Sequence, residues 1–148
     1  MTIAERTVAV TWEKALVSGQ GTLNGGTSGA LDGLPLTWAS RTESPEGKTS
    51  PEELAAAAHS GCFAMALALR LGEHRIVPTR LDVAATVTLA AVGGIPTVVS
   101  SNLRVRAWAA GLDVSGFQSI VDEAAALCPI SRLFTGATIA VSAELEPS

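Results

Sequence analysis

Two cysteines, Cys62 and Cys128, are the residues of this 148-residue chain that could do chemistry as a pair. Each lies in, or at the end of, a segment with the composition of a helix. Two thiols on two helices suit peroxide reduction, in which one thiolate attacks the peroxide and becomes a sulfenic acid. The second thiol then closes a disulfide on that sulfenic acid. Taken alone, each cysteine could equally be a small buried apolar residue.

A reactive thiol needs a cation or a helix dipole beside it, because the thiolate is the nucleophile. Arg41, in "WASRTES", is the nearest arginine upstream of Cys62 and stands where a strand is expected to enter a loop. A solvated surface charge is the alternative interpretation of Arg41. His59 precedes Cys62 by three residues, so the two share a helical face. His59 therefore either tunes the thiol or its pocket, or is a buried histidine with one hydrogen bond.

A zinc site is the alternative to thiol chemistry, because His59, Cys62, His74 and Cys128 are all zinc-ligand types. The chain has no Cys-x-x-Cys pair, however, and its His-x-x-Cys lies in a segment expected to be a buried helix. It also lacks a glycine-rich phosphate loop and a Gly-x-Ser-x-Gly elbow. We therefore expect neither a metal nor a cofactor.

The segment that carries the first cysteine has helix signals at both ends. Ser50 is a suitable N-cap, Pro51 suits the first helical position, and Glu53 completes a Ser-x-x-Glu capping box. Residues 51–71 are nearly all strong helix formers, and Gly72 is expected to end the helix. Because this helix is apolar nearly all the way round, we expect it to be buried on most sides.

The rest of the chain gives mostly strand signals, in which apolar and polar residues alternate between turn residues. Strands are expected at 6–23 with a hairpin, on either side of the turn residues 24–33, at 81–89, at 95–110 and at 137–146. Residues 41–49 are expected to form a loop, residues 113–128 a second helix interrupted at Pro129, and Ser131 to cap a short turn. The order predicts one α+β domain over residues 1–148, with mostly antiparallel sheet around the long helix.

Composition limits the classes of function. Apolar residues make up 47% of the chain and charged residues 16%, so we expect apolar surface to be buried against another subunit. The net charge of −4 argues against a nucleic-acid partner, because phosphate binding needs a basic surface. The N-terminus does not look like a signal peptide, and no apolar stretch approaches about 20 residues. We therefore expect a cytoplasmic protein with no membrane partner, in a compartment that keeps thiols reduced.

Three segments together resemble the OsmC/Ohr family, the osmotically inducible and organic hydroperoxide resistance proteins. They are "TSPEELAAAAHSGCFAMAL" at 49–67, "CPISRLF" at 128–134, and "TWASRTESPEGKTSPEEL" ahead of the long helix. The resemblance covers essentially the whole chain, and "AAHSGCF" is similar to the OsmC branch. It implies an OsmC-like fold and an intertwined homodimer, in which sheets wrap around central helices that carry the cysteines. It also implies reduction of organic hydroperoxides by a small or protein-bound dithiol, without a cofactor.

The resemblance implies separate roles for the two cysteines. Cys62 matches the cysteine that attacks the peroxide, and Cys128 matches the one that resolves the sulfenic acid. His59 and Phe63 are then expected to belong to the substrate pocket, since an alkyl hydroperoxide needs apolar walls for its carbon chain. The alternative function is a non-enzymatic protein that binds an apolar, lipid-like ligand and whose thiols are incidental.

Glu52 matches the carboxylate that pairs with the family's active-site arginine, although it is also an ordinary first-turn residue favoured by the helix dipole. The OsmC branch has this arginine just before the helix, which indicates Arg41. The Ohr branch has it nearer the N-terminus, where this chain has only Arg6. Ten residues of helix separate Glu52 from Cys62 and advance the axis by about 15 Å. We therefore expect a composite site, in which Glu52 and Arg41 come from the partner chain.

Overall fold

The computed structural model describes residues 1–147 and confirms the predicted α+β class, with two three-stranded sheets and a long helix. The chain forms two compact units, residues 1–54 and a second unit that begins at Ala55. The boundary falls inside the long helix α2 (Pro51–Glu73), whose first turn belongs to the first unit. The single domain predicted over residues 1–148 stays a prediction, because compactness of two parts does not establish that either folds alone.

The first unit contains an antiparallel sheet in the order β1 (Ala9–Glu13), β2 (Gln20–Asn24) and β3 (Pro35–Leu36). The hairpin predicted within residues 6–23 is therefore present, and its two strands are β1 and most of β2. The sheet leads into a short helix, α1 (Trp38–Thr42), whose last two residues were expected to begin a loop.

Reciprocal capping explains this short helix. The Thr37 hydroxyl accepts a hydrogen bond from the backbone N–H of Ser40 at 3.0 Å, and the Ser40 hydroxyl accepts one from the N–H of Thr37 at 2.9 Å. The two bonds satisfy backbone donors that a helix this short leaves unpaired. Arg41 consequently lies in the last turn of a helix and not in a loop.

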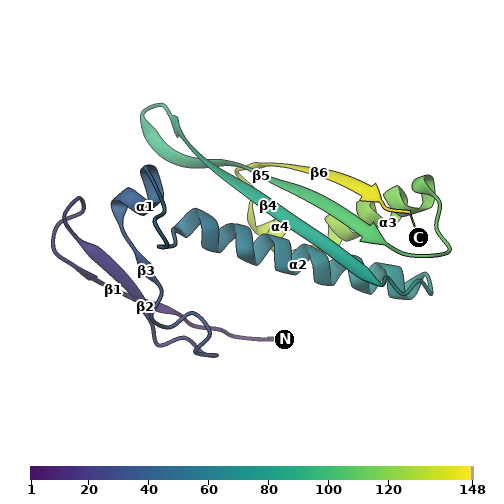
Figure 1. Ribbon diagram of the computed structural model, residues 1–148, viewed down its shortest axis with the longest axis horizontal. Coiled ribbons are helices and arrows are strands. Elements are labelled where there is room, and N and C mark those ends of the chain that lie inside the picture. The colour runs from purple at the N-terminus through teal and green to yellow at the C-terminus, as the bar shows by residue number, and fades with distance from the viewer. Residues whose placement is uncertain (148) are drawn as a thin grey trace. The chain divides into compact units, whose positions relative to one another are not determined.

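The second unit contains β4 (Arg80–Val92) and β5 (Ile95–Trp108), which pair antiparallel around a turn at Gly93-Gly94, and β6 (Thr138–Leu145) (Figure 1). β6 runs parallel to β5, a pairing that the alternation pattern does not reveal. A parallel neighbour requires a crossover connection, and helices α3 (Val114–Leu127) and α4 (Pro129–Leu133) lie in it. Pro129 thus starts a new helix after interrupting the old one, and Ser131 lies inside that helix instead of capping a turn.

Helix α2 runs along the sheet of the second unit (Figure 1) and begins as predicted, with the Ser50 hydroxyl accepting a hydrogen bond from the N–H of Glu53 at 3.2 Å. The helix continues through Gly72 to Glu73, so the predicted stop at Gly72 is wrong. A glycine that ends a helix commonly adopts the left-handed conformation, and Gly72 does not have a positive φ.

Only one face of α2 is buried in the single chain. Phe63, Leu67 and Leu71 are fully buried and share one core with residues of β5 and α3. Met65 is 75% exposed and Leu69 58% exposed. The expectation of burial on most sides is therefore met on the sheet-facing side alone, because the sheet and α3 cover only that side.

By length and composition, α2 is the one helix among residues 1–147 that could cross a membrane, with a mean hydropathy of 1.4 over 18 residues. The apolar run in this helix is interrupted at residues 59–61 and at Arg70, so the expectation that no uninterrupted apolar stretch approaches this length is not contradicted. A helix at the core of a protein passes the same test, and α2 buries one face in the core with a hydrogen-bonded histidine on it. We interpret α2 as a core helix for this reason.

Candidate active site

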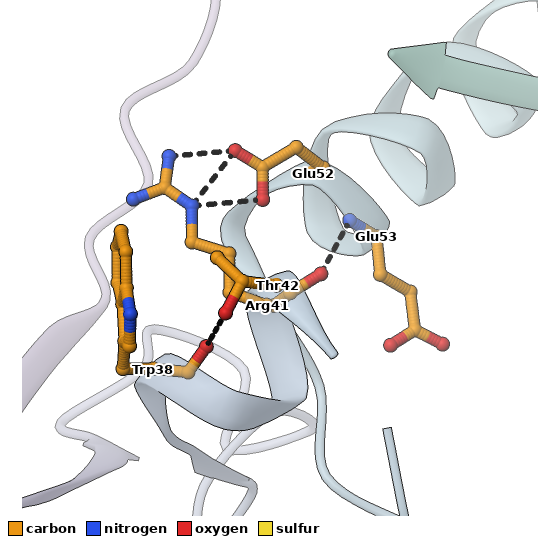
Figure 2. Close-up of polar contacts among 6 residues, drawn as sticks. Trp38, Arg41, Thr42, Glu52 and Glu53 are labelled. Atoms are coloured by element: carbon orange, nitrogen blue, oxygen red, sulfur yellow. Dashed lines mark hydrogen bonds and ion pairs between the residues drawn. The ribbon is translucent and has the colours of Figure 1, made fainter. Parts of the chain in front are cut away.

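Arg41 and Glu52 form an ion pair within the first unit (Figure 2). The Arg41 Nε donates to both carboxylate oxygens of Glu52, at 3.0 and 3.1 Å, and its Nη2 donates to Oε1 at 2.6 Å. The Glu52 side chain is only 12% exposed, and that of Arg41 30%. Glu52 lies in the first turn of α2, where the helix dipole also favours a carboxylate. The pair thus fixes the Nε–Nη2 edge of the guanidinium, while Nη1 points away from the carboxylate.

Trp38, in the first turn of α1, was not predicted to take part in a site. Its indole ring lies beside the guanidinium end of Arg41 (Figure 2). Both side chains line a small cavity of about 70 Å³, together with Trp12 and Pro51. The spacing of three residues between Trp38 and Arg41 could have indicated this neighbourhood, had α1 been recognised as a helix.

Cys62 lies in the second unit, on the part of α2 that borders a cavity of about 540 Å³. The other residues that line this cavity are apolar: Met65, Ala66, Leu69, Leu127 and Pro129. The cavity is thus built by the exposed face of α2 and the junction between α3 and α4. A thiol at an apolar wall can meet a molecule that has both a reactive polar end and a hydrocarbon chain.

Cys128, at the junction of α3 and α4, is fully buried, and it lies close enough to Cys62 to raise the pKa of that thiol. Both cysteines are free thiols. The fold therefore brings together two cysteines that are far apart in the sequence.

Burial raises the pKa of the Cys62 thiol, and the neighbouring Cys128 raises it further. The backbone N–H of Ile130 acts in the opposite direction, because a donor directed at the sulfur stabilises the thiolate. The surroundings of Cys62 in its own unit therefore do not by themselves supply the activation that a nucleophilic thiol requires.

His59 and Phe63 are both fully buried and do not line the 540 Å³ cavity. Phe63 packs in the core, and the two ring nitrogens of His59 hydrogen-bond to the hydroxyls of Ser101 at 2.6 Å and Ser131 at 2.8 Å. Any influence of these two residues on a substrate pocket must therefore pass through their neighbours. Ser101 was missed by the sequence analysis, although its position in line with the inward-facing residues of β5 is a signal for it.

The pKa of His59 is lowered from its ordinary value of 6.5, because burial disfavours the imidazolium. The unfolded chain therefore binds a proton at His59 that the folded chain resists. We expect the free energy of unfolding to fall as the pH drops from about 7.5 to 5.5, with the loss beginning near the unfolded pKa. Urea unfolding at the two pH values measures it. The variant His59→Asn should show a smaller pH dependence, and equal pH dependence in the two proteins would contradict this assignment.

The two histidines of the alternative zinc site have protein partners in this structure. Both nitrogens of His59 are engaged by serines, and His74 lies 3.2 Å from the Glu123 carboxylate. Within residues 1–147, no three histidine, cysteine or acidic side chains gather closely enough to hold a metal ion.

Comparison with known proteins identifies the family. The family description "OsmC-like protein" matches residues 44–144. The peroxiredoxin OsmC of Escherichia coli (strain K12) is 38% identical over 122 residues, which cover 82% of this chain and 84% of that protein.

Solved structures agree with this match. The organic hydroperoxide resistance protein OhrB of Bacillus subtilis has a TM-score of 0.70 at 26% identity, covering 95% of this chain and 98% of that one. An OsmC-like protein from Mycoplasma pneumoniae has a TM-score of 0.77 at 12% identity, covering 99% and 100%, which supports the fold alone. Both the sequence matches and the fold therefore show that this chain belongs to the OsmC-like protein family.

Proposed function

We propose that this protein is a thiol-dependent peroxidase that reduces organic hydroperoxides in oxidative or osmotic stress defence. The observation that carries the proposal is that Cys128 lies near enough to Cys62 to raise the pKa of its thiol, beside an apolar cavity that Cys62 and both chain neighbours of Cys128 line. Relatives named peroxiredoxin OsmC and organic hydroperoxide resistance protein support a peroxidase role.

The reaction follows from the two thiols. The Cys62 thiolate attacks the terminal peroxide oxygen, the O–O bond breaks, and the alkoxide takes up a proton and leaves as the alcohol. Cys62 is then a sulfenic acid, and the Cys128 sulfur attacks it to form the disulfide with release of water. A dithiol reductant returns both cysteines to thiols and becomes a disulfide itself. No step needs a metal or a cofactor.

The cavity favours an alkyl hydroperoxide over hydrogen peroxide as the substrate. Its volume of about 540 Å³ and its apolar lining can hold a hydrocarbon chain beside Cys62. The burial of Cys128 protects the second thiol from direct oxidation until Cys62 has reacted.

The proposed assembly is an intertwined homodimer. Apolar side chains remain exposed in the single chain at Val10 on β1 and at Met65 and Leu69 on α2, with exposed fractions of 51%, 75% and 58%. Exposed apolar side chains on two elements are typical of an interface that a second subunit covers. The cytoplasmic location stays a prediction.

A direct test is the consumption of an alkyl hydroperoxide by the wild-type protein with a dithiol reductant present. Stoichiometric turnover of peroxide and dithiol is expected. The alternative, a protein that binds an apolar ligand, predicts saturable binding of a fatty acid with no peroxide consumption. Observing only the binding would contradict the proposed function.

Arg41 is the proposed activator of Cys62. The surroundings of Cys62 raise its pKa, so a cation is needed to bring the thiolate into the neutral pH range. Arg41→Ala is expected to move the pH midpoint of Cys62 alkylation upward by about 1 to 3 pH units, the usual effect of an adjacent opposite charge. The reaction with iodoacetamide, followed across pH in a Cys128→Ser background, measures this.

Arg6→Ala is the matched control, because Arg6 is the arginine that the Ohr branch would indicate. Arg6 is exposed, and its guanidinium donates a hydrogen bond to the backbone carbonyl of the adjacent Glu5. A midpoint that moves with Arg6→Ala but not with Arg41→Ala would transfer the role to Arg6.

A further inference from the structure

His59 connects three elements of the second unit. It lies on α2, its Nδ1 hydrogen-bonds to Ser101 on β5, and its Nε2 hydrogen-bonds to Ser131 on α4. The ring also meets the ring of Phe134 edge to face, with centroids 5.3 Å apart. His59 and Ser101 are fully buried. Both ring nitrogens of the imidazole are therefore hydrogen-bonded.

The protonation state of this histidine fits the two serines. A neutral imidazole donates from one nitrogen and accepts at the other, and a hydroxyl can do either. One serine therefore accepts from the ring and the other donates to it, so every polar atom of the ring has a partner. A buried polar network of this kind fixes a relative position more narrowly than apolar packing does, because a shift leaves a buried group unpaired.

Helix α4 has few other stabilising interactions. It is five residues long, it has no side-chain hydrogen bond at its N-cap, and none of its residues is fully buried. Ile130 packs against the core only in part. The hydrogen bond between Ser131 and His59 is thus a polar contact that ties α4 to α2.

The position of α4 matters for both thiols. Cys128 directly precedes α4, and Ile130, whose backbone N–H lowers the pKa of the Cys62 thiol, lies within α4 next to Ser131. Disulfide closure requires the two Cα atoms to lie within about 4.4 to 6.8 Å of each other, a range that small movements of a short helix can leave.

We propose that Ser101, His59 and Ser131 form a positioning relay that holds α4 against α2, so that Cys128 stays in range to close the disulfide on Cys62. His59 and Ser131 are positioning residues in this relay, because the hydrogen bonds they make are to each other and to Ser101. The relay rests on the two-cysteine reaction proposed above, but its test does not need a peroxide.

The test uses an aromatic dipyridyl disulfide as the oxidant. The Cys62 thiolate attacks it, forms a mixed disulfide and releases one thiopyridone. The Cys128 thiolate then attacks the Cys62 sulfur of that mixed disulfide, the internal disulfide forms, and a second thiopyridone leaves. Stopped-flow absorbance records the two releases as separate phases, so the second phase reports the closure step.

Ser131→Thr and Ser131→Val are a matched pair, because the two side chains have nearly the same shape and only threonine carries a hydroxyl. Ser131→Val is expected to slow the second phase by about fivefold or more relative to Ser131→Thr, the factor that one net hydrogen bond provides. It should also raise the pH midpoint of the first phase, because the Ile130 N–H is no longer held at the Cys62 sulfur. Ser60→Ala, at a half-buried serine next to His59 whose hydroxyl bonds only to the backbone of its own helix, should change neither phase.

Equal second-phase rates in Ser131→Thr and Ser131→Val would overturn the relay, whether or not both variants are slower than the wild type. A wild type that releases only one thiopyridone would overturn it too. Should a β-branched variant fail to fold, Ser131→Ala compared with the wild type replaces the pair, with the same expected slowing. If the wild type does not consume hydroperoxides but Ser131→Val still slows the second phase, the peroxidase proposal is contradicted and the relay is supported.

Discussion

Cys62→Ser is expected to abolish peroxide reduction, with a fall in turnover of at least about 1,000-fold, as for other catalytic nucleophiles. A serine hydroxyl cannot form a sulfenic acid, and Cys128 is fully buried and cannot take over the attack. The measurement is hydroperoxide consumption under single-turnover conditions with reduced protein. Equal single-turnover rates in the wild type and in Cys62→Ser would remove Cys62 from the mechanism.

Cys128→Ser separates the two steps and is the matched control for this prediction. The variant should consume one equivalent of hydroperoxide and then stop as the sulfenic acid or as a mixed disulfide with added thiol. Mass spectrometry distinguishes these products from the internal disulfide of the wild type. If Cys128→Ser is the variant that loses the first equivalent, the two cysteines exchange roles.

The sequence was informative where local signals and burial agreed. Helix α2 begins where Ser50 and Glu53 predicted, because capping depends on neighbouring residues alone. Alternation likewise predicted a strand at 95–110, and β5 occupies Ile95–Trp108. The pairing of Arg41 with Glu52 came from the family resemblance, not from a physical pattern, and the ion pair is present.

What the sequence could not give depends on contacts between distant segments. The parallel direction of β6 is set by the crossover through α3 and α4, which alternation does not encode. The exposed face of α2 was missed because an all-round apolar helix looks the same whether its own chain or another chain covers it. The hydrogen bonds of His59 to Ser101 and Ser131 join residues 42 and 72 positions away, which no local pattern marks.

The active site is expected to be composite, with Arg41 and Glu52 of one subunit serving Cys62 of the other. Glu52 and Cys62 lie on one uninterrupted helix, ten residues apart, which places them about 15 Å apart along its axis. Arg41 is bound to Glu52 through three hydrogen bonds, so the two side chains act as one group. We therefore expect this group to serve the thiol of a second α2 that crosses the first, and not the thiol on its own helix.

Heterodimers made from Glu52→Ala and Cys62→Ser chains test this arrangement. In a composite site, the Cys62 of the first chain meets the Glu52 of the second, so one site of two is intact. The purified heterodimer should then have about half of the wild-type activity, since the sites of a two-fold dimer are equivalent. If each site is built within one chain, neither site is intact, and the heterodimer should be no more active than the Glu52→Ala homodimer.

The reciprocal heterodimer pairs a wild-type chain with a Glu52→Ala/Cys62→Ser double variant. It carries the same two substitutions, now in one chain, and the expected activities are reversed. A composite arrangement leaves the only Cys62 facing the chain that lacks the Glu52 carboxylate, so activity should be close to that of Glu52→Ala. A site within one chain leaves the wild-type chain complete, so about half of the activity should remain. Purification through two different affinity tags ensures that only heterodimers are assayed. Activity in the reciprocal pair and none in the first would show that Glu52 serves the cysteine of its own chain, and that Arg41 must reach the thiol in another way.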